Sequence, residues 1–259
     1  MVPRCLTIAG SDSGGGAGIQ ADLKAFAAAG CYGTSAIVAL TAQNTQGVMA
    51  VHELPADFVR AQLDAVYEDI GIDAAKTGML FSSAVIATVA DFLAGRNLPL
   101  VVDPVMIASS GATLLQAEAV ETLVSRLFPL ATVVTPNLHE AKALADGGGG
   151  SRRDLAEHIH KLGAAAVLVT GGHGEEAVDH LFDGEHHVEI PIERHDTAAT
   201  HGAGCTHSAT LAAGLAKGRS LEQAAREAAT VASEAVRHGL AEIGAGDGPV
   251  DVLHLNGAA

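Results

Sequence analysis

The sequence predicts an α/β fold in which a mostly parallel sheet carries helices on both faces. Short apolar runs alternate with longer helical patterns along most of the chain, which is typical of right-handed βαβ units. Hydrophobic residues make up 48% of the 259 residues but aromatic residues only 3%. A core of Ala, Val, Leu and Ile suits helices that pack closely on a sheet.

The predicted strands are brief aliphatic or β-branched runs, each followed by Gly, Pro, Asp or Asn. They are Leu6–Ala9, Ser35–Thr41, Ala74–Gly78, Leu100–Asp103, Thr132–Thr135 and Ala166–Thr170.

Helical patterns fill the intervals and the C-terminal part of the chain. The predicted helices are Gly18–Ala29, Asp57–Ile70, Ser83–Ala94, Ala117–Leu127, Arg152–Leu162, Cys205–Lys217 and Leu221–Leu240.

The alternation changes after Thr170, where two short runs flank Asp183-Gly184 and predict a hairpin. A second small β element, serving as a lid or edge hairpin, is expected around Ala42–Val51. The glycines at Gly147–Gly150 predict a surface loop and not a linker, because the alternation continues beyond them. We therefore expect one domain over residues 1–259.

Charge and cysteine usage exclude several classes of protein. The net charge of −15 argues against a nucleic-acid or anionic-membrane surface, since both need clustered Lys and Arg. Cys5, Cys31 and Cys205 are isolated, which is typical of a reducing compartment, and no apolar run approaches the roughly 20 residues of a membrane span. A cytoplasmic protein is expected.

Two glycine-rich segments precede helices. Gly10–Gly18 follows the first strand, where it is either a ligand-binding turn or a structural one. No acidic residue ends the second strand about 20 residues further on, where a dinucleotide fingerprint requires one, and no Gly-Lys-Ser/Thr of a P-loop follows the segment. The segment His201–Thr206 predicts a nest of N–H groups suited to a phosphate; the alternative is a loop that permits close helix packing.

Polar residues follow two further strands. Asp103 ends one strand, and Asn137 and Glu140 follow another. Their oxygens could hold a hydrated Mg²⁺ beside the phosphates of ATP, or Asn137 and Glu140 could simply cap a short helix.

Seven blocks together resemble the bacterial hydroxymethylpyrimidine/phosphomethylpyrimidine kinases of thiamine biosynthesis, which belong to the ribokinase superfamily. The resemblance spans nearly the whole chain, and its most specific part is the run that ends at Lys24. The blocks are Leu6–Asp12, Gly15–Lys24, Ala42–Thr45, Lys76–Leu80, Asp103–Met106, Thr135–Leu138 and His201–Thr206.

The resemblance implies a ribokinase-like fold, a homodimer, and ATP-dependent phosphorylation of 4-amino-5-hydroxymethyl-2-methylpyrimidine and then of its monophosphate. It also implies the residues that line the pyrimidine pocket. These are Gly10, Asp22, Gln43, Met79 and Val105. A pyridoxine or pyridoxal kinase is the rival within the superfamily, and a non-catalytic pyrimidine-binding relative is the rival outside the enzymes.

The catalytic turn implied by the resemblance is Gly202, Ala203, Gly204 and Cys205. Cys205 stands where sugar kinases of the superfamily carry an Asp that acts as a base. We hypothesise that a carboxylate here would repel the ionised second substrate by about 4 kcal/mol per charge pair at an effective dielectric constant near 20, whereas Cys205 can be neutral or a thiolate.

On the nucleotide side we expect Asn137, Glu140, Thr170 and Gly172, with Asp103 and Glu140 as ligands of Mg²⁺. The family often carries a Lys near the ATP phosphates where this chain has Thr170. Charge neutralisation must then rest on Mg²⁺, on the N–H nest, or on a Lys or Arg from elsewhere.

Overall fold

The computed structural model describes residues 1–107, 114–145, 147, 150–172, 174, 176–255 and 257. Gly148 and Gly149 of the predicted surface loop lie outside these residues, as does His173, which follows Gly172.

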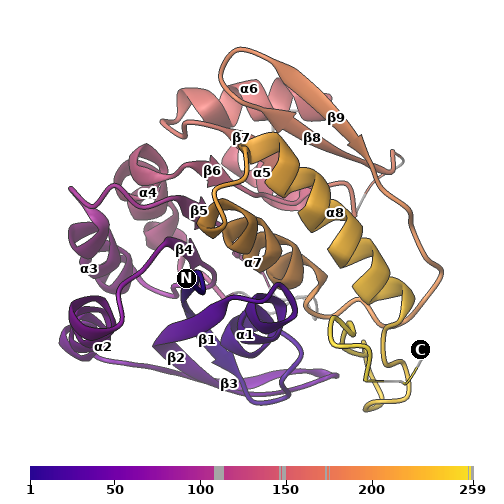
Figure 1. Cartoon of the computed structure of the whole chain (residues 1–259), viewed down its shortest axis with the longest axis horizontal. Helices are drawn as coiled ribbons and strands as arrows, with labels where there is room; N and C mark the ends of the chain where they lie inside the picture. Colours follow the sequence, from indigo (N-terminus) through magenta and orange to yellow (C-terminus); the bar gives the residue numbers. More distant parts are fainter. Residues whose placement is uncertain are drawn as a thin grey trace.

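The described residues form one sheet of nine strands in the order β3-β2-β1-β4-β5-β6-β7-β8-β9, which Figure 1 shows from β3 at the bottom to β9 at the top. The six central strands in this order, β2-β1-β4-β5-β6-β7, are parallel. Antiparallel strands flank them, β3 on one side and β8 and β9 on the other. The strands are β1 (Arg4–Asp12), β2 (Tyr32–Asn44), β3 (Gly47–Glu53), β4 (Ala74–Thr77), β5 (Leu100–Val102), β6 (Val133–Val134), β7 (Val167–Val169), β8 (Val178–Phe182) and β9 (His187–Pro191).

Helices cover both faces of the sheet, and each face has its own apolar core. One core packs Leu63, Val89 and Ile159 against the strands, and the other packs Phe26 and Leu211. The first face carries α2 (Ala56–Asp69), α3 (Ser83–Leu93), α4 (Ala117–Arg126), α5 (Leu138–Leu144) and α6 (Arg152–Lys161), and the second carries α1 (Gly18–Ala28), α7 (Ala203–Ala216) and α8 (Leu221–Arg237). A short 3₁₀ turn, Phe128–Leu130, precedes β6.

The predicted architecture is confirmed; the differences lie at the ends of elements and in α5, which is not among the predicted helices. β1 and β2 run further than predicted, because a bulge between Ala9 and Ser11 lets the pairing of the two strands continue past Gly10. The predicted lid is the β2–β3 hairpin at one edge of the sheet. No helix in the described part of the chain is long and apolar enough to cross a membrane.

Candidate active site

A pocket of about 880 Å³ opens at the carboxyl ends of the parallel strands, where ligands bind in open α/β sheets. The loops after β1, β4, β5, β6 and β7 line it, together with the end of β2, the N-terminus of α7 and one face of α8. The site residues predicted from the sequence that line the pocket are Gly10, Gln43, Met79, Asp103, Val105, Asn137, Glu140, Thr170, Gly172, Gly202, Ala203, Gly204 and Cys205.

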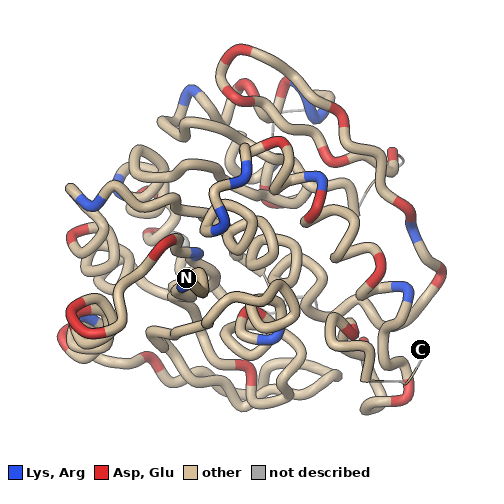
Figure 2. Tube along the Cα trace, in the orientation of Figure 1, with Lys and Arg blue, Asp and Glu red and all other residues tan. Residues whose placement is uncertain are grey.

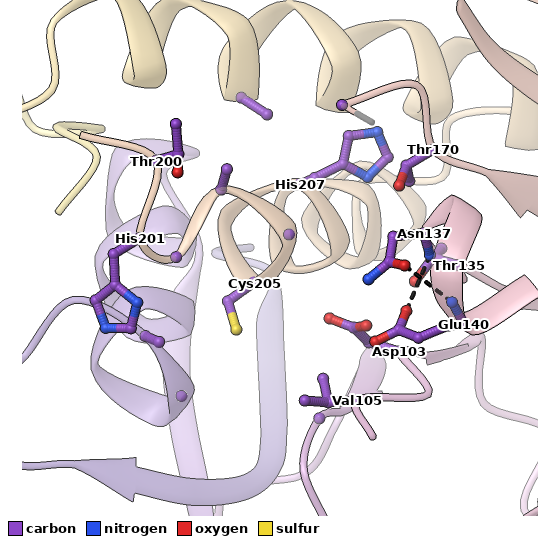
Figure 3. Close-up of a pocket in the computed structure, with 18 of the residues that line it drawn as sticks. Asp103, Val105, Thr135, Asn137, Glu140, Thr170, Thr200, His201, Cys205 and His207 are labelled. Atoms are coloured by element: carbon purple, nitrogen blue, oxygen red, sulfur yellow. Dashed lines mark hydrogen bonds between the residues drawn. The ribbon is translucent and has the colours of Figure 1, made fainter. Parts of the chain in front are cut away.

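The α7 corner, Gly202–Cys205, enters the middle of this pocket (Figure 3). Gly202 is the N-cap of α7, with φ 86°, and no side chain caps the helix. A Cβ at Gly202 would lie 1.8 Å from the carbonyl oxygen of Gly16, so only glycine fits against the first glycine-rich segment. The uncapped end of α7 therefore presents its N–H groups and dipole to the pocket.

The thiol of Cys205 points into the pocket between His201 and Asp103 (Figure 3). Burial raises the pKa of this thiol to about 12, and Lys76 and the N–H of Gly18 oppose the rise only in part. Cys205 is therefore a neutral thiol at neutral pH. The thiolate considered from the sequence is wrong for the free protein, because desolvation outweighs the helix N-terminus.

Asp12 joins the first glycine-rich segment to the α7 corner, a role the sequence did not predict. Its carboxylate contacts Nε2 of His201 at 2.9 Å and accepts from the N–H groups of Gly14, Gly16 and Ala17 at 2.7–3.0 Å. Burial opposes ionisation of Asp12, but His201 and these N–H groups lower its pKa overall. The two glycine-rich segments are thus held together by the contact between an ionised Asp12 and His201.

Lys76 lies fully buried beneath the pocket and was also missed from the sequence. Its Nζ is 2.8 Å from Asp22 and 3.8 Å from Asp103. Burial disfavours the ammonium form, yet the carboxylates of Asp22 and Asp103 raise the pKa of Lys76, so it is charged. The signal in the sequence that could have identified Lys76 as a buried, paired charge is its position within a short and mostly apolar predicted strand.

The predicted contact of Asp22 with the substrate needs correction. Asp22 is fully buried, does not line the pocket, and holds Lys76 Nζ at 2.8 Å and the Thr7 hydroxyl at 2.5 Å. Burial raises the pKa of Asp22 while Lys76 opposes the rise. Its carboxylate is therefore a support for Lys76 and does not reach a ligand.

The two carboxylates predicted to bind metal lie on the same side of the pocket (Figure 3). Glu140 accepts the N–H of Asn137 at 2.9 Å and Asn137 caps α5, so the helix-cap alternative is correct for both residues. Burial raises the pKa of Glu140 to about 8, and the charge of Asp103 adds to the rise. A divalent cation between the two groups would relieve that repulsion.

A metal here would need further oxygen ligands. Among the described residues, no three His, Cys, Asp or Glu side chains gather where they could hold an ion. Mg²⁺ commonly takes one or two carboxylates and completes its shell with water and substrate phosphates. Asp103 and Glu140 therefore fit Mg²⁺ that arrives with a phosphorylated ligand.

The β2 side of the pocket is a chamber that combines apolar walls with polar side chains. The Met79 side chain covers Gly10 so closely that a Cβ there would lie 2.5 Å from Met79 Cε. Val105 adds a second apolar wall. The Gln43 side chain accepts from Thr41 Oγ1 at 3.1 Å and lies 3.5 Å from His201 Nε2. This chamber suits a flat heterocycle with a ring nitrogen and an amino group.

The β7 side of the pocket is held by a buried pair that the sequence did not predict. Asp179 accepts the N–H of Gly171 at 2.6 Å and contacts His207 Nε2 at 2.9 Å. His207 is on the first turns of α7, so this pair ties the α7 corner to the loop that carries Thr170 and Gly172. An apolar wall completes this side and consists of Ile192, Ala229, Ala232 and Val236.

Known proteins resemble this chain over nearly its full length. Residues 12–251 match the family model described as phosphomethylpyrimidine kinase. The chain is 50% identical to a hydroxymethylpyrimidine/phosphomethylpyrimidine kinase of Rhizobium meliloti over 98% of both chains.

Among solved structures, a pyridoxal kinase of Bacillus subtilis in complex with ADP is 39% identical, with a TM-score of 0.89 over 99% of both chains. A pyridoxal kinase of Staphylococcus aureus, in complex with AMP-PCP and pyridoxal, is 34% identical with a TM-score of 0.88; the match covers 100% of this chain and 96% of that one. On the family match and the full-length identity, the chain belongs to the phosphomethylpyrimidine kinase family.

Proposed function

We propose that the protein transfers the γ-phosphoryl group of ATP to 4-amino-5-hydroxymethyl-2-methylpyrimidine and then to the resulting monophosphate. The observation that carries this proposal is the α7 corner, an uncapped helix N-terminus with a neutral thiol, between the chamber on the β2 side and the β7 side of the pocket. The relatives named as pyrimidine kinases support the substrate, and the complex of a structural neighbour with AMP-PCP supports ATP as donor.

In the first step the hydroxymethyl oxygen of the pyrimidine attacks the γ-phosphorus, the bond between the γ-phosphorus and the bridging oxygen of ADP breaks, and the hydroxyl proton passes to a phosphate oxygen or to water. The Gln43 amide pairs with the ring nitrogen and amino group, while Met79 and Val105 hold the ring between them. The N–H groups at the start of α7 stabilise the negative charge on the transferred group. A loose transition state demands little deprotonation of the attacking hydroxyl, so a neutral Cys205 is compatible with this step.

In the second step the attacking atom is a phosphate oxygen that is already ionised and needs no base. A neutral thiol at position 205 does not repel this dianion, whereas a carboxylate would. One site can then accept an alcohol and a phosphate in turn.

Asp103 and Glu140 would hold the Mg²⁺ that accompanies ATP. When bound, the metal would neutralise charge on the β- and γ-phosphates. Lys76 Nζ lies 3.8 Å from the Asp103 carboxylate, and the Asn137 N–H orients Glu140.

The test is ADP release with purified protein, ATP and Mg²⁺, with the pyrimidine, its monophosphate and pyridoxal as separate substrates. We expect ADP with both pyrimidines. ADP release with pyridoxal alone would show that pyridoxal, and not the pyrimidine, is the substrate. No ADP release with any of the three compounds would favour a protein that binds the pyrimidine without phosphorylating it.

We also propose that the protein is a homodimer. The edge hairpin exposes Leu40 and Met49, and the neighbouring α2 exposes Phe58, so apolar side chains gather near one edge of the sheet. Light scattering of the intact protein, compared with a Met49→Lys variant, tests this; a monomer at all micromolar concentrations would exclude it.

A further inference from the structure

The proposed reaction needs two parts of the pocket to stay in register. Gln43, at the end of β2, is the residue proposed to pair with the pyrimidine ring, and the α7 corner is where the phosphoryl group is transferred. The ring and its attacking oxygen belong to one small molecule, so a shift of about 1 Å between the two parts would misalign the attack. The contacts that join the end of β2 to the α7 corner therefore bear on the rate of the reaction.

One connection runs along the first glycine-rich segment. Ser13 Oγ donates to the carbonyl oxygen of Gln43 at 2.8 Å and accepts the Gln43 N–H at 2.8 Å. Asp12, the preceding residue, contacts His201 at 2.9 Å, directly before the corner. This connection ends at Gln43 and does not include the hairpin turn that follows it.

A second connection is made by Asp247, in the segment that follows α8. This segment lies beside the end of the β2–β3 hairpin (Figure 1). The Asp247 N–H donates to the carbonyl oxygen of Thr45 at 3.0 Å. Its carboxylate accepts the N–H of Thr200 at 3.0 Å and the Thr200 hydroxyl at 3.1 Å. Thr200 lies two residues before Gly202, so a single residue joins the hairpin turn to the α7 corner (Figure 3).

The hairpin turn and the segment after α8 fit closely against each other. A Cβ at Gly246 would lie 2.0 Å from the carbonyl oxygen of Thr45, so the two main chains are in direct contact next to Asp247. The turn is itself fixed, because Asn44 Oδ1 accepts two of its main-chain N–H groups at 2.9 and 3.2 Å. A movement of either segment is therefore passed to the other.

The charge of Asp247 does not explain its position. Lys and Arg are sparse along the chain (Figure 2), and within the part that the structure describes Asp247 makes no ion pair. It lines a pocket proposed to bind an anionic nucleotide, where a further negative charge opposes binding. The two donors of Thr200 are the partners of its carboxylate, which favours a positioning role.

From this geometry we propose that Asp247 is a positioning residue for phosphoryl transfer, which holds the α7 corner in register with the hairpin turn that follows Gln43. The inference rests on the proposed kinase function. Asp247 acts through Thr200 and Thr45 and not through contact with a reacting atom. The competing explanations are that Asp247 only stabilises the segment after α8, or that its charge acts on the nucleotide.

Substitutions at Asp247 separate position from charge. Asp247→Ala removes both contacts with Thr200, and we expect kcat with the pyrimidine to fall about tenfold while the Kd for ADP stays unchanged. Asp247→Asn keeps an acceptor for the Thr200 N–H and offers a donor to its hydroxyl oxygen, so it should retain at least half of the wild-type kcat. Steady-state ADP release measures kcat, and calorimetry measures the Kd for ADP.

Two further variants test the path through Asp247. Adding Thr200→Val to Asp247→Ala should lower kcat no further, because the hydroxyl has already lost its partner. Gly246→Ala displaces the hairpin turn from the other side and should raise the KM for the pyrimidine about tenfold. Asp91→Ala, which removes an exposed ion pair between α3 and α4, is the control and should match the wild type.

Three outcomes overturn the inference. If Asp247→Ala keeps the wild-type kcat, Asp247 only stabilises its segment. If Asp247→Asn loses as much as Asp247→Ala, or if both bind ADP more tightly than the wild type, the charge is what acts. If kcat and ADP affinity fall together in Asp247→Ala, the whole pocket is disturbed.

The wild type tests the proposed function separately. If it releases no ADP with either pyrimidine, the kinase proposal fails, and the inference that rests on it fails as well. Circular dichroism of each variant confirms that the fold is retained.

Discussion

The α7 corner and the β7 side of the pocket are held by different kinds of contact. At the corner, main chain packs on main chain, and Gly202 lies so close to Gly16 that no side chain fits. On the β7 side, long side chains make the connections, through Asp179, His207 and Arg194. A side chain at Gly202 would therefore overlap the main chain, whereas the side-chain contacts on the β7 side can be removed one at a time.

Lys76, beneath the corner, should give the largest effect. Lys76→Met leaves the carboxylates of Asp22 and Asp103 buried without their cation, and we expect the free energy of unfolding to fall by about 3–5 kcal/mol. Urea unfolding measures this loss. The double variant Lys76→Met/Asp22→Asn should recover part of it, and a single variant within about 1 kcal/mol of the wild type would show that Lys76 is not needed.

Gly202→Ala tests the close main-chain contact. The new Cβ would overlap Gly16 at a positive φ and displace the corner, so we expect kcat to fall about 100-fold. Gly95→Ala is the control, because Gly95 also has a positive φ but has no neighbouring atom within 4 Å of a Cβ. Equal kcat values for Gly202→Ala and the wild type would contradict the role of the contact.

Cys205→Asp tests the neutral thiol. An added carboxylate should repel the monophosphate substrate, so we expect the second phosphorylation to fall at least tenfold more than the first. Steady-state rates with each pyrimidine measure the ratio. Cys205→Ser, which stays neutral, should affect both steps alike, and equal losses in Cys205→Asp would exclude the repulsion.

Asp179→Ala tests the side-chain link on the β7 side. Loss of the contacts with Gly171 and His207 should raise the KM for ATP about tenfold, with the KM for the pyrimidine unchanged. Asp179→Asn keeps one acceptor and should lose less. Asp183→Ala, on the exposed β8–β9 turn, is the matched control; parallel changes in both KM values would mean that the link is not local.

Glu140 should give the smallest effect, a dependence of stability on pH. Its pKa is raised by burial and by Asp103 from 4.5 to about 8, so the folded state binds this proton more tightly than the unfolded state. The resulting stability is full below pH 4.5 and is lost as pH rises through 8. Without Mg²⁺, we expect the free energy of unfolding to fall as pH rises from 5 to 8.

Urea unfolding at several pH values measures this slope. Glu140→Gln keeps an acceptor for the Asn137 N–H and should flatten it. An unchanged slope in this variant would assign the pH dependence to another group.

The residues whose structural role depends on their neighbours in the chain could be predicted from the sequence. The short apolar runs became strands, and the glycines at Gly202 and Gly204 became the start of a helix at the pocket, because these features depend on neighbours in the chain. Asp103, Asn137 and Glu140 follow strands, and the carboxyl ends of parallel strands meet at one edge of the sheet.

Residues that act through distant partners were not predictable. Asp22 lies in the most specific block of the sequence, yet it supports Lys76, which is 54 positions away. Asp12 meets His201 across 189 positions, and Asp179 meets His207 across the β9–α7 segment. The sequence by itself thus determined the sheet, the starts of the helices and the family to which the chain belongs. Long-range packing decided which charged side chains line the pocket and which pair with one another in the interior. The physical reason is that burial and charge pairing depend on the whole fold.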